Sequence, residues 1–168
     1  MAINIKGIGH VGLLVSDMDR SFKFYTEVLG CHVTHRTKRP DGSETAFLRF
    51  DEDHHNIVLA TAPAGLDVTH DGMPVRLIQQ IAMDVENRDE FLRALAHVHS
   101  HGIELISGPS VAGPEGGGGV GGSGSHHFYF LDPDGNRLEI FYGQIRVPNG
   151  EQFPREEYAE ALRFFARS

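Results

Sequence analysis

The stretch that decides the fold is His10-Val11-Gly12-Leu13-Leu14-Val15-Ser16-Asp17-Met18-Asp19, because the chain repeats its pattern later on. From Gln80 the sequence Gln-Ile-Ala-Met-Asp-Val-Glu-Asn-Arg-Asp has a similar order of apolar and polar residues. In each copy an apolar strand runs directly into a helix. A unit of this length buries too little apolar surface by itself, so the repeat predicts two modules that pair within one domain.

The first module, residues 5–61, has the expected order βαβββ. Alternation over residues 7–15 predicts a strand, and apolar residues at helical spacing predict a helix over 17–30. We expect Ser16 and Asp19 to cap this helix and Gly30 to end it. Three further strands are expected over 31–39, 44–50 and 56–61.

The second module, residues 76–143, follows a surface linker over 62–75 and repeats this order. Asn87 with Glu90 is expected to cap its helix, and Gly102 to end it. Its strands are predicted over 77–85, 103–106, 126–131 and 137–142. Together the modules make a domain over residues 1–143.

Two segments fall outside the repeat. Residues 113–125 are rich in glycine, and no Lys-Ser/Thr pair or helix follows, which excludes a phosphate loop. They are expected to form a flexible excursion, either a mobile cover over the site or a plain surface loop. Residues 144–168 form a tail in which a short amphipathic helix is predicted from Pro154, packed on the domain or on a neighbouring subunit.

Composition narrows the function. The 168 residues carry a formal charge of -8, which disfavours a nucleic-acid partner, and no apolar run approaches the roughly 20 residues that span a bilayer. Cys31 is the only cysteine, so no internal disulfide forms. We expect a cytoplasmic protein, forming a homo-oligomer such as a dimer, that acts on a small molecule and not at a membrane.

The duplication places polar side chains at equivalent points of the two modules. His10 begins the first strand of module one, and Gln80 begins that of module two. Glu139 lies in the last strand of module two, where module one has Val58. A carboxylate in so apolar a strand is costly to bury unpaired, so Glu139 is expected to meet a metal or another partner. The alternative is a surface ion pair with Arg137.

These motifs resemble the vicinal oxygen chelate superfamily. The resemblance rests on His10-Val11-Gly12-Leu13, on Val28-Leu29-Gly30 within the helix, and above all on residues 130–139, Phe-Leu-Asp-Pro-Asp-Gly-Asn-Arg-Leu-Glu. It covers residues 5–143. It implies an α+β fold in which paired βαβββ modules form a cupped mixed-sheet barrel around a divalent metal.

Within the superfamily the chain is most similar to the type I extradiol dioxygenases, which cleave catecholic rings in aromatic catabolism. The resemblance implies metal ligands at His10, Gln80 and Glu139, with Fe(II) as the expected metal and Mn, Zn or Ni as alternatives. Gln80 departs from the family pattern, which has histidine there, and an amide is a weaker donor than imidazole.

The same resemblance implies roles for residues that do not hold metal. His55 is expected to serve as a base or oxygen-stabilising group, and Tyr129 to donate a hydrogen bond to a developing oxyanion. His127 is not assigned by the resemblance; it lies on the same side of its strand as Tyr129 and is the candidate acid for that reason, with His126 as the fallback. The other candidate histidines, His54, His97, His99 and His101, are assigned to the surface.

Two other functions stay open. One is a non-oxidative lyase or isomerase of the glyoxalase or epimerase type, which Val58 disfavours because such members place a fourth ligand on that strand. The other is a metal-free binding or drug-resistance protein, which Gln80 favours and the set of His10, His55, Tyr129 and Glu139 disfavours.

Overall fold

The computed structural model describes residues 7–66, 69–70, 73–74, 78–119 and 122–148. The chain divides into two compact units, Met1–Leu77 with Asp132–Gly135, and Ile78–Leu131 with Asn136–Ser168. Unit one contains β1 (Val11–Val15), α1 (Met18–Lys23), a π-helix (Phe24–Val28), β2 (His32–Lys38), β3 (Glu44–Arg49) and β4 (Ile57–Thr61). Unit two contains β7 (Ile81–Asp84), α2 (Arg88–Ser100), β8 (Leu105–Val111), a 3₁₀ turn (Pro114–Gly116), β9 (His126–Leu131) and β10 (Arg137–Tyr142).

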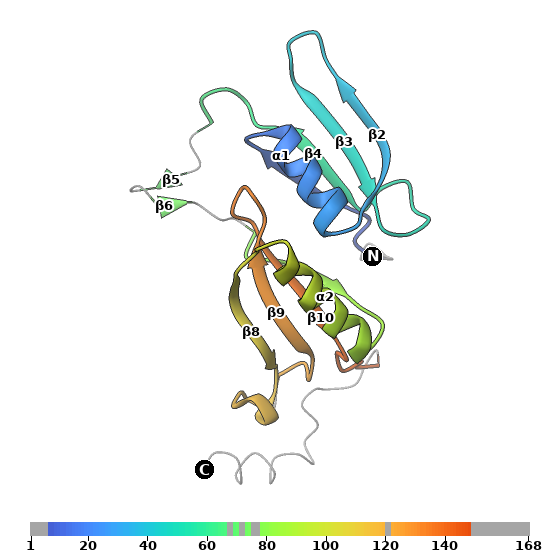
Figure 1. The fold of residues 1–168 in the computed structure, drawn as a ribbon, viewed down its shortest axis with the longest axis vertical. Coiled ribbons are helices and arrows are strands. Elements are labelled where there is room, and N and C mark those ends of the chain that lie inside the picture. The colour runs from blue at the N-terminus through green and yellow to red at the C-terminus, as the bar shows by residue number, and fades with distance from the viewer. Residues whose placement is uncertain (1–6, 67–68, 71–72, 75–77, 120–121, 149–168) are drawn as a thin grey trace, which may run out of the picture. The chain divides into compact units, whose positions relative to one another are not determined.

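Both units have the same sheet topology (Figure 1). The strand orders are β1-β4-β3-β2 and β7-β10-β9-β8, and in each sheet the first strand pairs in parallel with the last one in sequence. The remaining neighbours are antiparallel. This confirms the α+β class and the repeated βαβββ order. The described strands form separate four-stranded sheets, however, and not one closed barrel.

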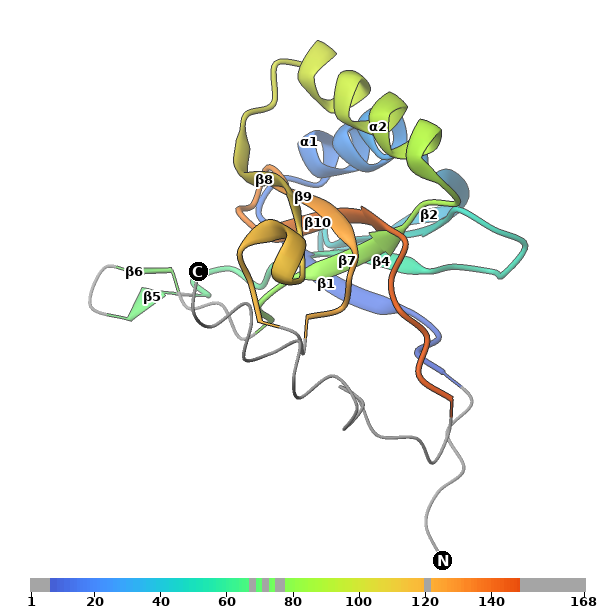
Figure 2. The ribbon, with the colours of Figure 1, turned by 90° about the horizontal axis from the view of Figure 1, so that it is seen from below.

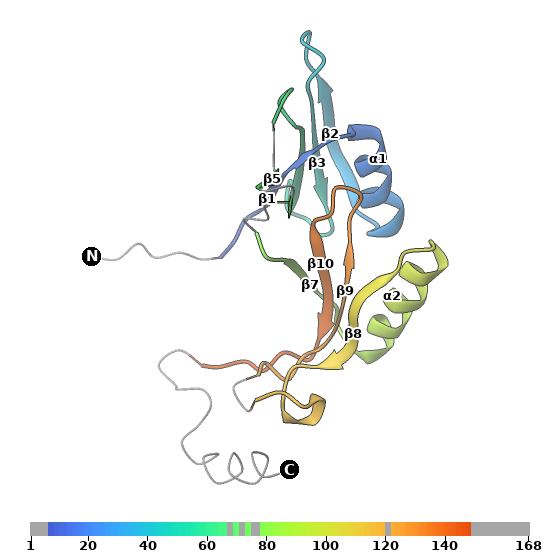
Figure 3. The same cartoon turned by 90° about the vertical axis from the view of Figure 1, so that its left-hand side faces the viewer.

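In each unit one face of the sheet is covered by its own helix, as Figure 3 shows for α1 and α2. In unit one Leu13, Val15, Leu48 and Leu59 alternate toward the covered face and are buried. In unit two Phe91 of α2 lies 5.2 Å from Phe128, ring centre to ring centre. The core of unit two also contains Phe130, Leu138, Ile140 and Val98. In unit two the opposite face of the sheet carries the side chains of Tyr129 and Glu139.

The N-termini of α1 and α2 are each capped by a side chain; the cap of α2 is the expected residue and the cap of α1 is not. Asn87 accepts hydrogen bonds from the backbone N–H groups of Asp89 and Glu90, which confirms it as the cap of α2. In α1 the cap is Asp17, which accepts from Arg20 N–H, so the expected capping pair of Ser16 with Asp19 is wrong. The Ser16 side chain is bonded to Asp134 instead.

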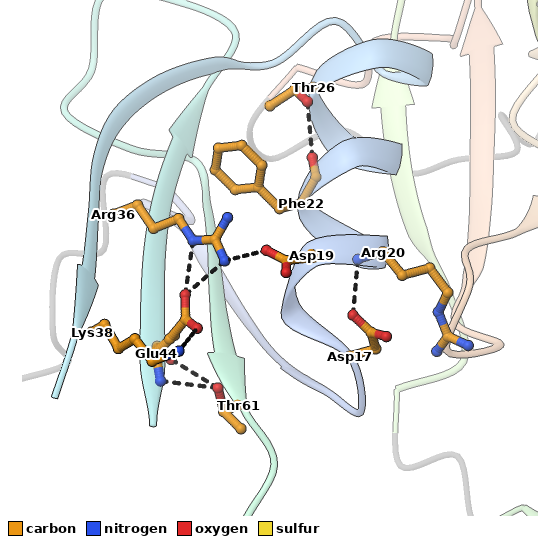
Figure 4. A network of polar contacts seen from close by, with 9 residues as sticks. All are labelled: Asp17, Asp19, Arg20, Phe22, Thr26, Arg36, Lys38, Glu44 and Thr61. Atoms are coloured by element: carbon orange, nitrogen blue, oxygen red, sulfur yellow. Dashed lines mark hydrogen bonds and ion pairs between the residues drawn. The ribbon is translucent and has the colours of Figure 1, made fainter. Parts of the chain in front are cut away.

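A polar network attaches α1 to its sheet (Figure 4). The Arg36 guanidinium on β2 contacts Asp19 of α1 at 2.5 Å and Glu44 of β3 at 2.6 Å. The same guanidinium lies 4.7 Å above the Phe22 ring. Arg36 of β2 thus contacts both the helix α1 and the neighbouring strand β3.

The turn Asp132–Gly135 belongs structurally to unit one. The Tyr25 hydroxyl donates to Asp132 Oδ2 at 2.9 Å within the buried interior. Asp134 accepts from the hydroxyls of Ser16 and Ser21 and from Arg20. The sequence predicts a turn here. The structure adds that the carboxylates of Asp132 and Asp134 attach this turn to the segment that contains α1 and Tyr25.

Several strands begin or end at residues other than those predicted from the sequence. The first strand of unit two is Ile81–Asp84, shorter than the expected 77–85, although Leu77 itself lies outside the described residues. Strand β8 extends to Val111 and not only to Ile106, because Ser107 and Ser110 continue the pairing with β9 across two irregularities. The expected linker contains a two-stranded pair, β5 (Thr69–His70) and β6 (Met73–Pro74).

The glycine-rich excursion follows β8 and forms the coil beside it in Figure 2. Its ends are joined by hydrogen bonds from Ala112 N–H to Ser125 O and from Gly124 N–H to Ala112 O. A Cβ at Gly116 would lie 2.1 Å from the carbonyl oxygen of Val111, so glycine is needed for this close approach. The helix predicted from Pro154 lies outside the described residues. Within the described chain, every helix is too short or too polar to cross a bilayer.

Candidate active site

The candidate site in unit two is centred on Glu139. Its side chain is only 6% exposed, and in the sheet it pairs with Tyr129 on one side and Ala82 on the other. The Gln80 amide nitrogen donates to one carboxylate oxygen at 2.5 Å, and the Tyr129 hydroxyl donates to the other at 3.1 Å. The sheet therefore brings together three of the residues that the sequence singled out.

These three side chains line a pocket of about 250 Å³ on the sheet face opposite α2. Ala82, Ala112, Ser123, Ser125, His127, Phe141 and Gln144 complete its lining. Ser123 and Ser125 come from the end of the glycine-rich excursion, and Ala112 directly precedes it. The excursion therefore borders the site.

Arg137 shapes the Tyr129 environment. Its guanidinium carbon lies 3.9 Å from the centre of the Tyr129 ring, a cation–π arrangement, and its Nε atom is buried with no partner in the described structure. Burial and then the Glu139 carboxylate raise the pKa of Tyr129, while Arg137 acts in the opposite direction. The phenol therefore stays protonated and able to donate at neutral pH.

The structure does not contain the surface ion pair between Arg137 and Glu139 that the sequence left open as an alternative. Glu139 is buried, and among the described residues its carboxylate has no ion pair with Arg137. Arg137 was not expected at the site from the sequence. The strand alternation of Arg137, Glu139 and Phe141 is the signal that places all three on one face.

His127 and His126 lie on opposite faces of β9. The His127 ring contacts the Ser110 hydroxyl at 2.9 Å through Nε2, and its centre is 5.1 Å from that of Tyr129. His126 instead stacks on Tyr142 at 4.7 Å, and Tyr142 contacts Phe91 of α2. Of the two candidate acids, His127 lines the pocket and His126 does not.

Unit one contains the other two candidate residues, His10 and His55. Their ring centres are 4.5 Å apart, and His55 also contacts Phe47 at 5.0 Å. His54 and His55 approach at 2.9 Å between their Nδ1 atoms. Burial lowers the pKa of His55, and the neighbouring imidazoles of His10 and His54 add to this effect. An imidazole of this kind favours its neutral, proton-accepting form.

The structure thus groups the six predicted residues in two sets: His10 with His55 in unit one, and Gln80, His127, Tyr129 and Glu139 in unit two. No group of three His, Cys, Asp or Glu side chains suited to a metal occurs among the described residues. The ligand set that the resemblance implies includes the amide of Gln80, which is outside these four residue types. Val58 lies on β4 opposite Gly12 and Phe47 and offers no donor atom.

Comparison with known proteins gives the family. The model of the glyoxalase/bleomycin resistance protein/dioxygenase superfamily matches residues 7–140. The chain belongs to this superfamily. This confirms the resemblance seen in the motifs, and superfamily members generally bind divalent metals.

Curated relatives in the superfamily include dioxygenases. The chain is 25% identical over 142 residues to 2,2',3-trihydroxybiphenyl dioxygenase of Sphingomonas paucimobilis and 27% identical over 140 residues to biphenyl-2,3-diol 1,2-dioxygenase 2 of Rhodococcus globerulus. The matches cover 84% and 83% of this chain. The chain spans only 43% and 64% of the length of these two relatives.

Solved structures of the superfamily share the fold. A glyoxalase family protein from Enterococcus faecalis matches with a TM-score of 0.61 and 21% identity, covering 81% of this chain and 97% of that one. A fosfomycin resistance protein from Listeria monocytogenes, solved with Mn(II), matches with a TM-score of 0.59 and 16% identity, covering 84% of this chain and 96% of that one. At these identities the likeness is one of fold alone.

Proposed function

We propose that the chain is a divalent-metal-dependent enzyme that cleaves a catecholic ring with dioxygen in the manner of extradiol dioxygenases. The observation that carries the proposal is the buried Glu139 carboxylate, which shares a pocket with Gln80 and Tyr129. The dioxygenase relatives support it. Iron as the metal, a homo-oligomeric state such as a dimer and a cytoplasmic location are parts of the same proposal.

The donor set fits a divalent cation. Glu139 is a buried carboxylate whose hydrogen-bond donors, Gln80 and Tyr129, are neutral, so its charge has no cation bonded to it among the described residues. A half-turn of the Gln80 amide would present its oxygen in place of its nitrogen. Within unit two, Glu139 and Gln80 are the residues that would hold the metal. The resemblance to the superfamily adds His10 as a further ligand. A bound Fe(II) would supply coordination positions for two neighbouring substrate oxygens and for dioxygen.

The chain's own residues then bind substrate and move protons. The Tyr129 hydroxyl, held beside the carboxylate, would donate a hydrogen bond to an oxyanion that develops on the substrate. His127, with the Ser110 hydroxyl at 2.9 Å, would hold a proton on the same side of the pocket. His55, whose pKa is lowered, would accept a proton from a substrate hydroxyl.

A second candidate is a non-oxidative lyase or isomerase of the same superfamily. The observation that favours it is Gln80, a neutral donor in place of the histidine that the extradiol resemblance implies. A metal-free binding protein is the third possibility, since two neutral hydrogen bonds already satisfy the Glu139 carboxylate.

Metal analysis of protein purified without added metal or chelator, combined with a catechol ring-opening assay, tests the proposal. We expect iron in the pocket and a yellow ring-opened product, both lost in Glu139→Gln. Glu115→Gln, at an exposed position, is the matched control and should retain both. Bound zinc or nickel without ring opening would contradict the proposal and favour a lyase or isomerase. A metal-free protein that binds catechol would contradict it and favour a binding protein.

A further inference from the structure

A second cluster of imidazoles lies at the end of α2, away from the pocket. The end of α2 and its C-cap residue His101 have the sequence His97-Val98-His99-Ser100-His101, and the three histidines are exposed. Val98 is buried on the side of the helix that faces the sheet. The pocket lies on the opposite face of that sheet, so the site described above does not use these histidines.

His97 and His101 lie on one side of the helix because they are four residues apart. The backbone N–H of His101 donates to His97 O at 3.3 Å, which closes the last turn and fixes the spacing of the two side chains. Their ring centres are 4.6 Å apart, with an angle of 66° between the planes. The two rings are therefore close enough for one nitrogen of each to reach a shared cation after rotation of the side chains.

We propose that His97 and His101 form a chelating surface site for a divalent transition cation of the Cu²⁺, Ni²⁺ and Zn²⁺ class. A cation about 2.0 to 2.1 Å from one nitrogen of each ring would hold the ring centres about 4.5 to 5 Å apart for a ligand angle near 90 to 100°. The separation in the structure matches this arrangement without rebuilding the backbone. The position at the helix C-terminus adds to the attraction, because the helix dipole favours cations there.

The chemistry of the donors sets the selectivity. Imidazole nitrogen suits copper, nickel and zinc, with copper bound most tightly, whereas Mg²⁺ and Ca²⁺ prefer oxygen donors. The two side chains occupy two coordination positions, and water fills the others. The second imidazole binds as an intramolecular step, so either residue alone is expected to bind about 10²-fold more weakly than the pair.

Titration calorimetry of the chelator-treated full chain with Ni²⁺, and separately with Mg²⁺, tests the site. We expect the wild type to bind one Ni²⁺ more than the double variant His97→Ala/His101→Ala, and each single variant to lose about 10²-fold in affinity. His99→Ala is the matched control, because His99 is exposed on the same turn but two residues away from both ligands. It should bind like the wild type.

The calorimetry distinguishes the proposed site at the end of α2 from metal binding in the Glu139 pocket. Loss of one Ni²⁺ in the double variant supports the helix site whether or not the pocket binds metal, since that pocket is intact in the variant. Equal Ni²⁺ binding by wild type and a double variant of unchanged circular dichroism would overturn it. So would a loss in His99→Ala as large as that in His97→Ala, or equally tight binding of Mg²⁺.

Discussion

The Tyr25 hydroxyl donates a hydrogen bond to Asp132 at 2.9 Å, joining residues 107 positions apart in a buried environment. Burial and then the Asp132 carboxylate raise the pKa of Tyr25, so the phenol stays protonated and donates at all ordinary pH values. The bond anchors the Asp-Pro-Asp-Gly turn that leads into β10, the strand that carries Glu139.

Tyr25→Phe should therefore destabilise the protein. The variant keeps the ring but leaves the Asp132 carboxylate without this donor, which should cost about 1 to 3 kcal/mol of unfolding free energy. Urea unfolding measures the loss. Tyr142→Phe is the control, because the Tyr142 hydroxyl has no hydrogen bond among the described residues, and its effect should stay below about 0.5 kcal/mol. Equal losses in both variants would contradict the prediction.

Asp134 should make stability depend on pH. Burial alone would raise the pKa of its carboxyl, but hydrogen bonds from Ser16 and Ser21 and the Arg20 guanidinium hold that pKa below its usual value. Its contribution is thus fully present above the unfolded pKa of about 3.9 and is lost as pH falls through the lower folded value.

The unfolding free energies of wild type and Asp134→Asn should then differ by a constant amount above about pH 5 and converge at lower pH. Urea titrations from neutral pH down to the acid limit of folding measure this. Asp53→Asn, in an exposed loop, should follow the wild type throughout. If the difference in unfolding free energy instead grows as the pH falls, the folded state does not lower the pKa of Asp134 and the prediction is wrong.

Gln80→His should raise Fe(II) affinity, since imidazole is a stronger donor than an amide, and should create or increase ring cleavage of a simple catechol. Iron content after dialysis and the yellow product report the two effects. Gln79→His places the same imidazole at an exposed neighbouring position and should change neither. If Gln80→Ala retains both iron and rate, Gln80 is not a ligand.

His55→Phe should lower turnover by about 10² to 10⁴ while metal and substrate binding persist, which is the usual effect of removing a positioned acid–base group. Steady-state kinetics with metal analysis checks this. His99→Phe, on the exposed end of α2, should leave the rate unchanged. A His55→Phe rate within a few-fold of wild type would return His55 to a structural role.

Some features of the candidate site could be predicted from strand alternation. Glu139 could be predicted as a carboxylate in an apolar strand, and Tyr129 from the family resemblance; their registered pairing on adjacent strands brings them together. Arg137 was not assigned to the site, because its stacking on Tyr129 depends on how a long side chain lies across two strands. The Ser110 contact with His127 could not be predicted either, because β8 pairs irregularly with β9.

The sequence by itself determined the repeated βαβββ order, because apolar periodicity and the Asn87 cap act between residues close in the chain. It also determined the superfamily, through the motif that ends in Glu139. Only the tertiary structure decided that Ser16 bonds Asp134 instead of capping α1, and that Tyr25 bonds Asp132. Such bonds depend on side-chain positions that come together only when distant segments fold, and no local pattern records them.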